Sequence, residues 1–303
     1  MILRISAAAL AIAVAATSGA APQRTFRSGV DVVRVDALVT DGRRPIGGLR
    51  SEDFELRDNG VLQTIDAIAL ESVPLTVTFV LDTSGSVAGD KISHLSSAVD
   101  SVLNGMRQQD RAALVTFSHR VWQRIALTSE WERVRRVLTA AHAEGGTSLN
   151  DAVYAGLALS ESQEARPLVL VFSDGMDNAS WLPAGTVENA ARRADAVVYG
   201  VAVAAATIVD ARRESRAVSR PQYLSGQTDF LEAIAAATGG RVIKADTTID
   251  LPKAFDEILR EFRTRYLITY SSRGVDTPGW HTIDLKVKGR RAEVKARRGY
   301  ERR

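Results

Sequence analysis

The stretch from Thr76 to Asp90, TVTFVLDTSGSVAGD, constrains what this chain can fold into more than any other part of the sequence. It opens with the uncharged run Val77 to Leu81, which is rich in β-branched and aromatic residues and ends at Asp82. This pattern predicts a strand buried on both faces, with a carboxylate at its C-terminal end. Asp82, Ser84 and Ser86 then alternate with small residues, so that three short oxygen-bearing side chains can converge in one tight loop.

Two later stretches offer further oxygen ligands at equivalent places. Gly145 to Ser148, with the sequence GGTS, predicts a tight turn that carries a hydroxyl just before a helix. Leu168 to Gly175 repeats the first design, with an apolar strand, an aspartate and a glycine turn. In an open α/β sheet, ligands bind outside the carboxyl ends of the strands, where loops from neighbouring strands meet. We therefore expect one site to gather these side chains: Asp82, Ser84, Ser86, Thr147 and Asp174.

The chemistry of these ligands indicates a hard cation. Carboxylate and hydroxyl oxygens favour Mg²⁺, Mn²⁺ or Ca²⁺, and without Cys in the chain or a nearby His we do not expect zinc or copper. The motif around Asp82 is also compatible with an ordinary helix N-cap. A phosphoryl-transfer loop with Asp82 as nucleophile is disfavoured, because no Lys stands close by and no GxxxxGK[ST] phosphate loop is present.

The same residues resemble the complete metal-ion-dependent adhesion site of a von Willebrand factor type A domain. The matching elements are Asp82-x-Ser84-x-Ser86, Thr147 in a Gly-Gly-Thr turn, and Asp174 in Ser-Asp-Gly. The resemblance implies that the three hydroxyls are metal ligands and that the two aspartates act directly or through ordered water. It also implies an open metal position that an acidic side chain of a partner protein completes.

The first 21 residues of the chain predict an exported protein. Residues 1–21 combine one early Arg, an apolar run and small residues at the end, which predicts a secretory signal peptide cleaved after Ala20 or Ala21. An uncleaved membrane anchor is the alternative, and no later stretch has the roughly 18 apolar residues of a membrane span. We expect a periplasmic or secreted protein. Because the chain has no Cys, its stability must come from its core rather than from disulfides.

The periodicity of the sequence divides the rest of the chain into three segments. Residues 22–73 and 264–303 show strand patterns, with an Asn59-Gly60 hairpin turn, and residues 74–263 alternate strands with helices. We expect a doubly wound, mostly parallel α/β sheet with helices on both faces, inserted into a small β-sandwich built by the N- and C-terminal strands. Several short motifs in the two outer segments resemble a group of exported bacterial proteins with type A domains: Val39-Thr40-Asp41, Glu52-Asp53-Phe54, Asp58-Asn59-Gly60 and Arg297-Arg298-Gly299-Tyr300.

Apolar residues recurring every three to four positions predict the helices of the middle segment. The expected helices cover residues 91–106, 131–141, 149–160, 187–194, 230–237 and 251–262. The expected strands of the C-terminal segment cover residues 265–270, 280–287 and 292–297.

Some polar residues around the expected site have more than one interpretation. We expect Asp151 to be a helix cap rather than an acceptor near the metal, and Asp177 and Asn178 to be turn residues rather than outer groups of the site. The basic stretch from Asp210 to Arg220 is expected to be a surface loop, with recognition of an acidic partner as the alternative.

These features predict a divalent-cation-dependent module that binds a protein outside the cytoplasm. A metal-dependent hydrolase and a module whose metal only braces its loops are the alternatives. We do not expect an enzyme, because the site lacks a His and the four histidines form no local pair at ligand spacing. The formal net charge of +3 is too small to indicate nucleic-acid binding.

Overall fold

A computed structural model describes residues 32–42, 44–70, 72–160, 165–174, 176–203 and 225–302 of the chain. The predicted signal peptide, the basic stretch from Asp210 to Arg220 and Gly175 lie outside these described residues.

A six-stranded sheet forms the centre of the α/β part, in the order β11-β10-β9-β6-β7-β8. Five neighbouring strands run parallel, and the edge strand β8 is antiparallel to β7. The strands are β6 (Leu75–Asp82), β7 (Arg111–Phe117), β8 (Val121–Thr128), β9 (Arg166–Ser173), β10 (Val197–Val203) and β11 (Val242–Ala245). Every residue of β6 is buried, as its uncharged run predicts for a central parallel strand.

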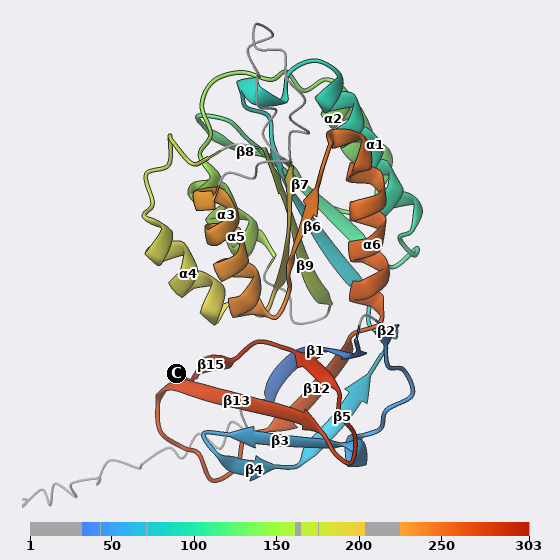
Figure 1. The fold of residues 1–303 in the computed structure, drawn as a ribbon, viewed down its shortest axis with the longest axis vertical. Helices are drawn as coiled ribbons and strands as arrows, with labels where there is room; N and C mark the ends of the chain where they lie inside the picture. The colour runs from blue at the N-terminus through green and yellow to red at the C-terminus, as the bar shows by residue number, and fades with distance from the viewer. Residues whose placement is uncertain are drawn as a thin grey trace, which may run out of the picture. The chain divides into compact units, whose positions relative to one another are not determined.

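Helices cover both faces of this sheet (Figure 1). Alternate side chains of β6 enter different cores: Phe79 and Leu81 pack with α1, α2 and α6, whereas Val80 packs with α3, α4 and α5. The helices are α1 (Asp90–Asn104), α2 (Trp131–Thr139), α3 (Leu149–Leu159), α4 (Ala184–Arg193), α5 (Ser225–Thr238) and α6 (Leu251–Arg263). The predicted doubly wound α/β arrangement is therefore confirmed.

The strands before and after the α/β part pair with one another. They are β1 (Val32–Asp41), β2 (Arg44–Pro45), β3 (Phe54–Asp58), β4 (Val61–Gln63), β5 (Ile65–Ala69), β12 (Tyr266–Ser271), β13 (Gly279–Val287), β14 (Glu293–Lys295) and β15 (Gly299–Arg302). One antiparallel sheet has the order β14-β1-β12-β5 and the other β15-β13-β3-β4. Side chains from both sheets share one core, so the N- and C-terminal segments build a common β structure.

Two elements depart most from the sequence prediction. The strand β15 was not predicted, because Tyr300 is the only large apolar residue among its four and no alternation is visible there. The helix α5 begins at Ser225, five residues before the predicted start, since its first turn is polar and gives no apolar spacing. No helix among the described residues is long and apolar enough to cross a membrane.

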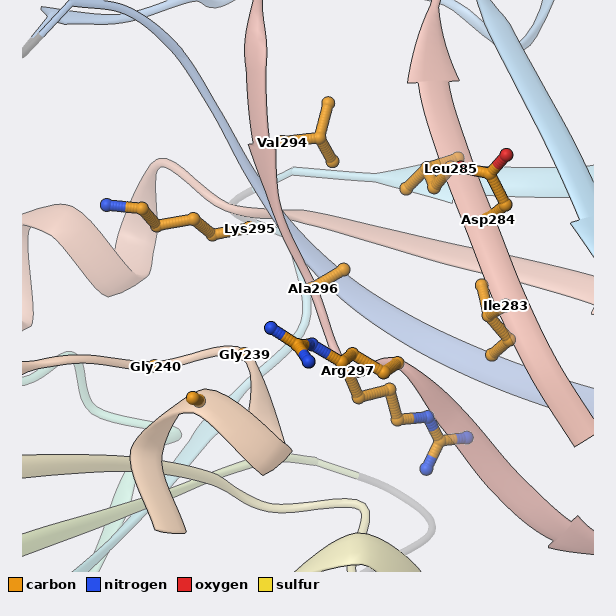
Figure 2. Close-up of a pocket in the computed structure, with 11 residues that line it drawn as sticks. Gly239, Gly240, Ile283, Asp284, Leu285, Val294, Lys295, Ala296 and Arg297 are labelled. Carbon is orange, nitrogen blue, oxygen red and sulfur yellow. The ribbon is translucent and has the colours of Figure 1, made fainter. Parts of the chain in front are cut away.

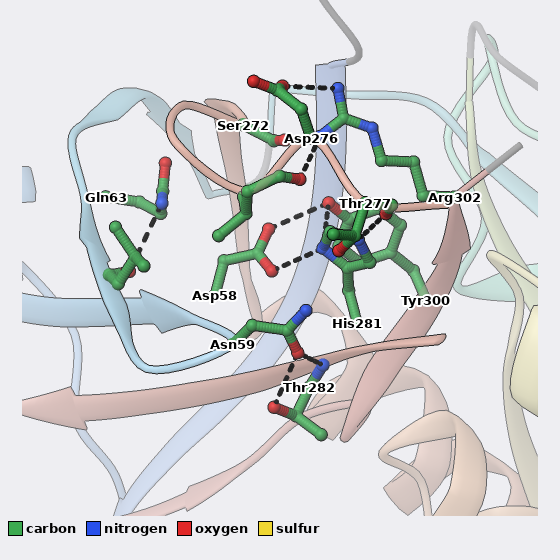
Figure 3. A network of polar contacts seen from close by, with 12 residues as sticks. Asp58, Asn59, Gln63, Ser272, Asp276, Thr277, His281, Thr282, Tyr300 and Arg302 are labelled. Carbon is green, nitrogen blue, oxygen red and sulfur yellow. Dashed lines mark hydrogen bonds and ion pairs between the residues drawn. The ribbon is translucent and has the colours of Figure 1, made fainter. Parts of the chain in front are cut away.

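A buried polar network links the two terminal segments (Figure 3). Asp58, at the end of β3, accepts hydrogen bonds from the hydroxyls of Tyr270 and Tyr300 at 2.9 and 2.8 Å. Its other oxygen lies 2.8 Å from Nδ1 of His281, whose Nε2 faces the carbonyl of Thr277. Because Asp58, Tyr270 and His281 are fully buried, this network ties β3 to strands more than 200 residues later in the chain.

Candidate metal centre

Two of the predicted ligands lie at the carboxyl ends of adjacent parallel strands. Asp82 is the last residue of β6 and Asp174 directly follows β9, and the two strands pair in register through Leu81 and Phe172. The last residue of β9, Ser173, donates a hydrogen bond of 2.6 Å from its hydroxyl to Asp82 Oδ2. The parallel pairing thus brings both carboxylates to one edge of the sheet.

The loop after β6 brings the two serines to Asp174. The backbone N–H of Ser84 donates to Asp82 Oδ1 at 2.8 Å, which turns the chain back over the strand end. The hydroxyls of Ser84 and Ser86 lie 3.0 Å apart, and Ser86 Oγ donates to Asp174 Oδ1 at 2.6 Å. Four of the five predicted side chains therefore stand in one cluster of oxygen atoms.

The turn that carries Thr147 is hydrogen-bonded to the same loop. Gly85 N–H donates to the carbonyl of Gly145 at 3.1 Å, and Glu144 N–H donates to the carbonyl of Thr83 at 3.0 Å. Thr147 as a whole residue is 4% exposed, and its backbone N–H and carbonyl make hydrogen bonds to the segment around Asn178. The backbone contacts of Gly85 and Glu144 place the Thr147 turn beside the loop that carries Ser84 and Ser86.

The electrostatics of the cluster favour a cation. Burial raises the pKa of Asp82 to about 6, and the charge of Asp174 acts in the same direction, although hydrogen bonds from Ser173 and Ser84 oppose both effects. The ionised carboxylate of Asp82 is thus poorly stabilised by the protein alone. Hydroxyls and carboxylates without thiol or imidazole match a hard divalent cation. The cluster contains two carboxylates, and no group of three or more acidic, His or Cys side chains suited to a metal occurs among the described residues.

A lysine lies at this cluster, contrary to the sequence analysis. Lys91, in the first turn of α1, places Nζ 2.8 Å from Asp174 Oδ2 and 2.6 Å from the carbonyl oxygen of Ser86. Its distance from Asp82 in the sequence concealed this contact, because the fold of the intervening loop decides where the ammonium lies. The expectation that no lysine stands close to the site is therefore wrong, although the sequence still has no phosphate-loop motif.

A histidine also lies closer to the site than the sequence analysis assumed. His119 follows β7, and its Nδ1 is 3.4 Å from the hydroxyl of Ser118. A Cβ atom built on Gly145 would stand 2.3 Å from the same Nδ1, so the imidazole lies directly against this glycine. Gly145 has a φ of +74°, a conformation that L side chains rarely adopt, and the close approach of His119 is a second reason for glycine here.

The segment after Asp174 is held against the Thr147 turn. Asn178 Oδ1 accepts the N–H of Thr147 at 2.8 Å, and the N–H groups of Asn178 and Ala179 donate to the carbonyl of Thr147 at 2.9 and 3.1 Å. Asp177 accepts a 2.5 Å hydrogen bond from Ser180. Asn178 therefore positions the backbone of a predicted ligand, a role beyond that of the turn residue we expected.

Asp151 does not cap its helix. Its two carboxylate oxygens accept the backbone N–H groups of Trp181 and Leu182 at 2.9 and 2.8 Å. The expected cap role is therefore wrong, because the carboxylate faces the 176–182 segment instead of the helix end. No local sequence signal distinguishes these two uses of an acidic residue in a first helical turn.

Figure 2 shows a depression at the C-terminal end of α5. It has a volume of about 360 Å³ and lies between the C-terminal end of α5 and the strands β13 and β14. Gly239 lets the helix end approach closely there, since a Cβ on it would stand 2.7 Å from the backbone of Ala296 and Arg297. None of the five predicted ligands lines this depression.

Comparison with known families agrees with the fold. The model of the von Willebrand factor type A domain matches residues 76–256, more than half of the chain. The chain belongs to the von Willebrand factor type A family. Domains of this family bind a divalent metal at the metal-ion-dependent adhesion site and generally mediate protein–protein interaction and metal-dependent adhesion.

Two similar curated proteins are inter-alpha-trypsin inhibitor heavy chains H4. The one from Sus scrofa is 35% identical over 150 residues, covering 48% of this chain and 15% of the heavy chain. The one from Bos taurus is 23% identical over 284 residues, covering 88% of this chain and 28% of the heavy chain. This type A chain thus spans a small part of the length of these relatives.

Two solved structures share the fold at low sequence identity. A von Willebrand factor type A protein from Catenulispora acidiphila has a TM-score of 0.53 at 12% identity, covering 81% of this chain and 73% of that chain. Proximal thread matrix protein 1 from the mussel byssus, with a zinc-occupied adhesion motif, has a TM-score of 0.53 at 14% identity, covering 68% of this chain and 49% of that chain. At these identities the likeness shows the type A fold alone.

Proposed function

We propose that this chain is a divalent-cation-dependent protein-binding module that acts outside the cytoplasm. Asp82, Ser84, Ser86, Thr147 and Asp174 would hold the cation. The observation that carries the proposal is the cluster of oxygen atoms from Ser84, Ser86 and Asp174, linked by contacts of 3.0 and 2.6 Å, beside the buried Asp82. When bound, the cation would supply positive charge to which an acidic side chain of the partner can bind.

The charge balance of the site supports an anionic partner. Asp82 and Asp174 contribute two negative charges when ionised, and the serine and threonine hydroxyls are neutral ligands. With Lys91 beside Asp174, a bound divalent cation would leave the site with a net positive charge. The helix α3 begins at Leu149, two residues after Thr147, and the partial positive charge of its N-terminus adds to this preference.

Metal binding can be tested directly by titrating the purified protein with Mg²⁺, Mn²⁺, Ca²⁺ and Zn²⁺ in a calorimeter. Zn²⁺ is included because the mussel byssus protein carries zinc at its adhesion motif. We expect one binding event in the wild type that is lost in Asp174→Ala and retained in Asp284→Ala, a control on the exposed face of β13. Equal binding by all three proteins would refute the assignment of these ligands.

We also propose that the protein is not an enzyme. The support is chemical: Lys91 is paired with Asp174, and His119 packs against the backbone of Gly145 with Ser118 as its hydrogen-bond partner. Neither arrangement presents a free general base to a bound water. A screen of generic ester and phosphate substrates with Mn²⁺ tests the hydrolase alternative, and turnover that disappears in Asp82→Ala would overturn the proposal.

A metal that contacts the partner can be distinguished from a metal that only stabilises the loops of this chain. If the metal bridges to the partner, saturating chelator abolishes partner binding, whereas a bracing metal leaves partner binding in place.

We also propose that the protein is exported from the cytoplasm. The apolar segment of residues 1–21 supports it. Mass spectrometry of protein recovered from outside the cytoplasm tests it, with cleavage after Ala20 or Ala21 as the expected result. Full-length protein found only in the cytoplasm would contradict it.

A further inference from the structure

The loop that follows Asp174 exposes a large aromatic side chain. Trp181 is 93% exposed, the highest value for a large hydrophobic residue in the described part of the chain. Met176, on the same loop, is 49% exposed. An indole exposed to water does not gain the free energy that burial would give, so the folding of this chain alone does not explain the exposure of Trp181.

The backbone beneath Trp181 is held in place by several hydrogen bonds. The carboxylate of Asp151 accepts both the N–H of Trp181, at 2.9 Å, and the N–H of Leu182, at 2.8 Å. Asn150 Nδ2 donates to the carbonyl of Leu182 at 3.0 Å, and the Leu182 side chain packs against the core on this face of the sheet. The loop is thus anchored on both sides of the residue whose side chain it exposes.

The anchored loop is continuous with the candidate metal centre. Asn178 makes two hydrogen bonds with Thr147 and Ala179 makes a third, and Trp181 follows three residues after Asn178. Three residues span at most about 10 Å, so the Cα atom of Trp181 lies within about that distance of Asn178, which is bonded to the Thr147 turn. Tyr154, 42% exposed, lies one turn beyond Asp151 on α3 and adds a second aromatic ring near the loop.

We propose that Trp181 is the aromatic anchor of the partner-binding surface beside the metal. This inference rests on the proposed function and specifies the partner. The partner is a protein segment that presents a carboxylate and, within a few residues of it, an apolar or aromatic side chain. The carboxylate binds at the metal centre while the apolar side chain packs on the indole. A carboxylate alone carries little specificity, whereas pre-ordered tryptophans are among the residues that dominate binding at protein interfaces.

A displayed peptide library provides the test, with one fixed Asp flanked by random positions and selection in Mn²⁺ against chelator. We expect the enriched peptides to carry an aromatic or large aliphatic residue within about four positions of the Asp. Trp181→Ala should weaken binding of an enriched peptide at least tenfold. The matched control is Trp280→Ala, which removes a 40% exposed indole from β13 in the separate β structure and should leave binding unchanged.

A second variant tests the anchoring of the loop. Asp151→Asn keeps the indole but has one acceptor oxygen in place of two, so we expect weaker peptide binding with unchanged Mn²⁺ affinity. Near-ultraviolet circular dichroism checks that each variant is folded.

Calorimetry with Mn²⁺ separates failure of this inference from failure of the proposed function. If the wild type binds no Mn²⁺, the metal centre itself is refuted. If it binds Mn²⁺ but Trp181→Ala binds the enriched peptides as tightly as the wild type does, the anchor is refuted and the metal centre stands. Peptides without an apolar preference, or no enrichment in Mn²⁺ over chelator, would also overturn the inference.

Discussion

Replacing Asp58 should destabilise the β structure that the two ends of the chain build together. Its carboxylate is the acceptor for two tyrosine hydroxyls and faces Nδ1 of a buried histidine (Figure 3). Burial raises the pKa of Tyr270 and of Tyr300, and the charge of Asp58 acts in the same direction, so both hydroxyls stay protonated and donate. In Asp58→Ala these donors lose their common acceptor.

The size of the effect follows from the number of buried hydrogen-bond donors that lose the Asp58 carboxylate as their acceptor. Each buried donor left without a partner costs about 1–3 kcal/mol. Tyr300 OH lies 3.3 Å from His281 Nδ1 and can regain part of its bonding, which lowers the total. We expect a loss of about 3–6 kcal/mol from the free energy of unfolding. With an m-value of about 2 kcal/mol/M, the urea midpoint should fall by about 1.5–3 M.

Urea unfolding, followed by circular dichroism and fluorescence together, measures this loss. Asp58→Asn keeps the size and one acceptor oxygen, so its midpoint should lie between those of the wild type and Asp58→Ala. The control is Asp276→Ala, whose carboxylate is 82% exposed and pairs with Arg302 in the same region; it should change stability by less than about 0.5 kcal/mol. An Asp58→Ala midpoint equal to that of the control would refute the reasoning.

Three further predictions concern other parts of the molecule. Lys91→Met removes an ammonium 2.8 Å from Asp174 Oδ2, so Mn²⁺ affinity measured by calorimetry should rise roughly tenfold, and unchanged or weaker binding would contradict this. Gly240→Ala would place Cβ 1.9 Å from the carbonyl oxygen of Val198 and should lower the free energy of unfolding, measured with urea, by at least about 2 kcal/mol. The control is Gly185→Ala, because Gly185 has open space around it. Equal urea midpoints for the two variants would refute the steric argument. Burial opposes ionisation of Glu261, but the hydrogen bonds and charge of Arg241 outweigh it and leave the pKa of Glu261 below its ordinary value of 4.5. The stability that this pair contributes is present above about pH 4.5 and is lost as the pH falls through the lowered pKa. The urea midpoint of the wild type should therefore drop more between pH 5 and pH 3 than that of Glu261→Gln. Parallel pH profiles of the two proteins would show that the pair contributes nothing to stability.

The elements predicted best are those with a strong local pattern. The buried strand ending at Asp82 has an uncharged, β-branched run before a carboxylate, and its central place in a parallel sheet follows from that run. The convergence of Ser84, Ser86 and Asp174 could be predicted because β6 and β9 are parallel neighbours whose carboxyl ends must meet. Strand β15 was missed since its four residues contain no alternation.

The surroundings of the candidate metal centre were harder to predict than the positions of its oxygen-bearing side chains. Lys91 reaches Asp174 only because the loop after Ser86 turns into α1 at Asp90, and side-chain reach across such a turn has no periodic signature. Asp151 was expected to cap α3, yet it binds two backbone N–H groups about 30 residues further along the chain. Contacts of this kind depend on tertiary packing, and the residues next to Lys91 or Asp151 in the sequence give no sign of them.

The most direct measurement of the central claim is a thermal melt of the purified protein with and without divalent metal. A ligand at about a hundred times its Kd stabilises the folded protein by roughly 2.7 kcal/mol. The wild type should therefore melt at a clearly higher temperature in millimolar Mg²⁺ or Mn²⁺ than in chelator, whereas Asp82→Ala should melt at the same temperature in both. A wild-type midpoint that ignores the metal, or an Asp82→Ala midpoint that rises with it as the wild type does, would contradict the assignment of the metal centre.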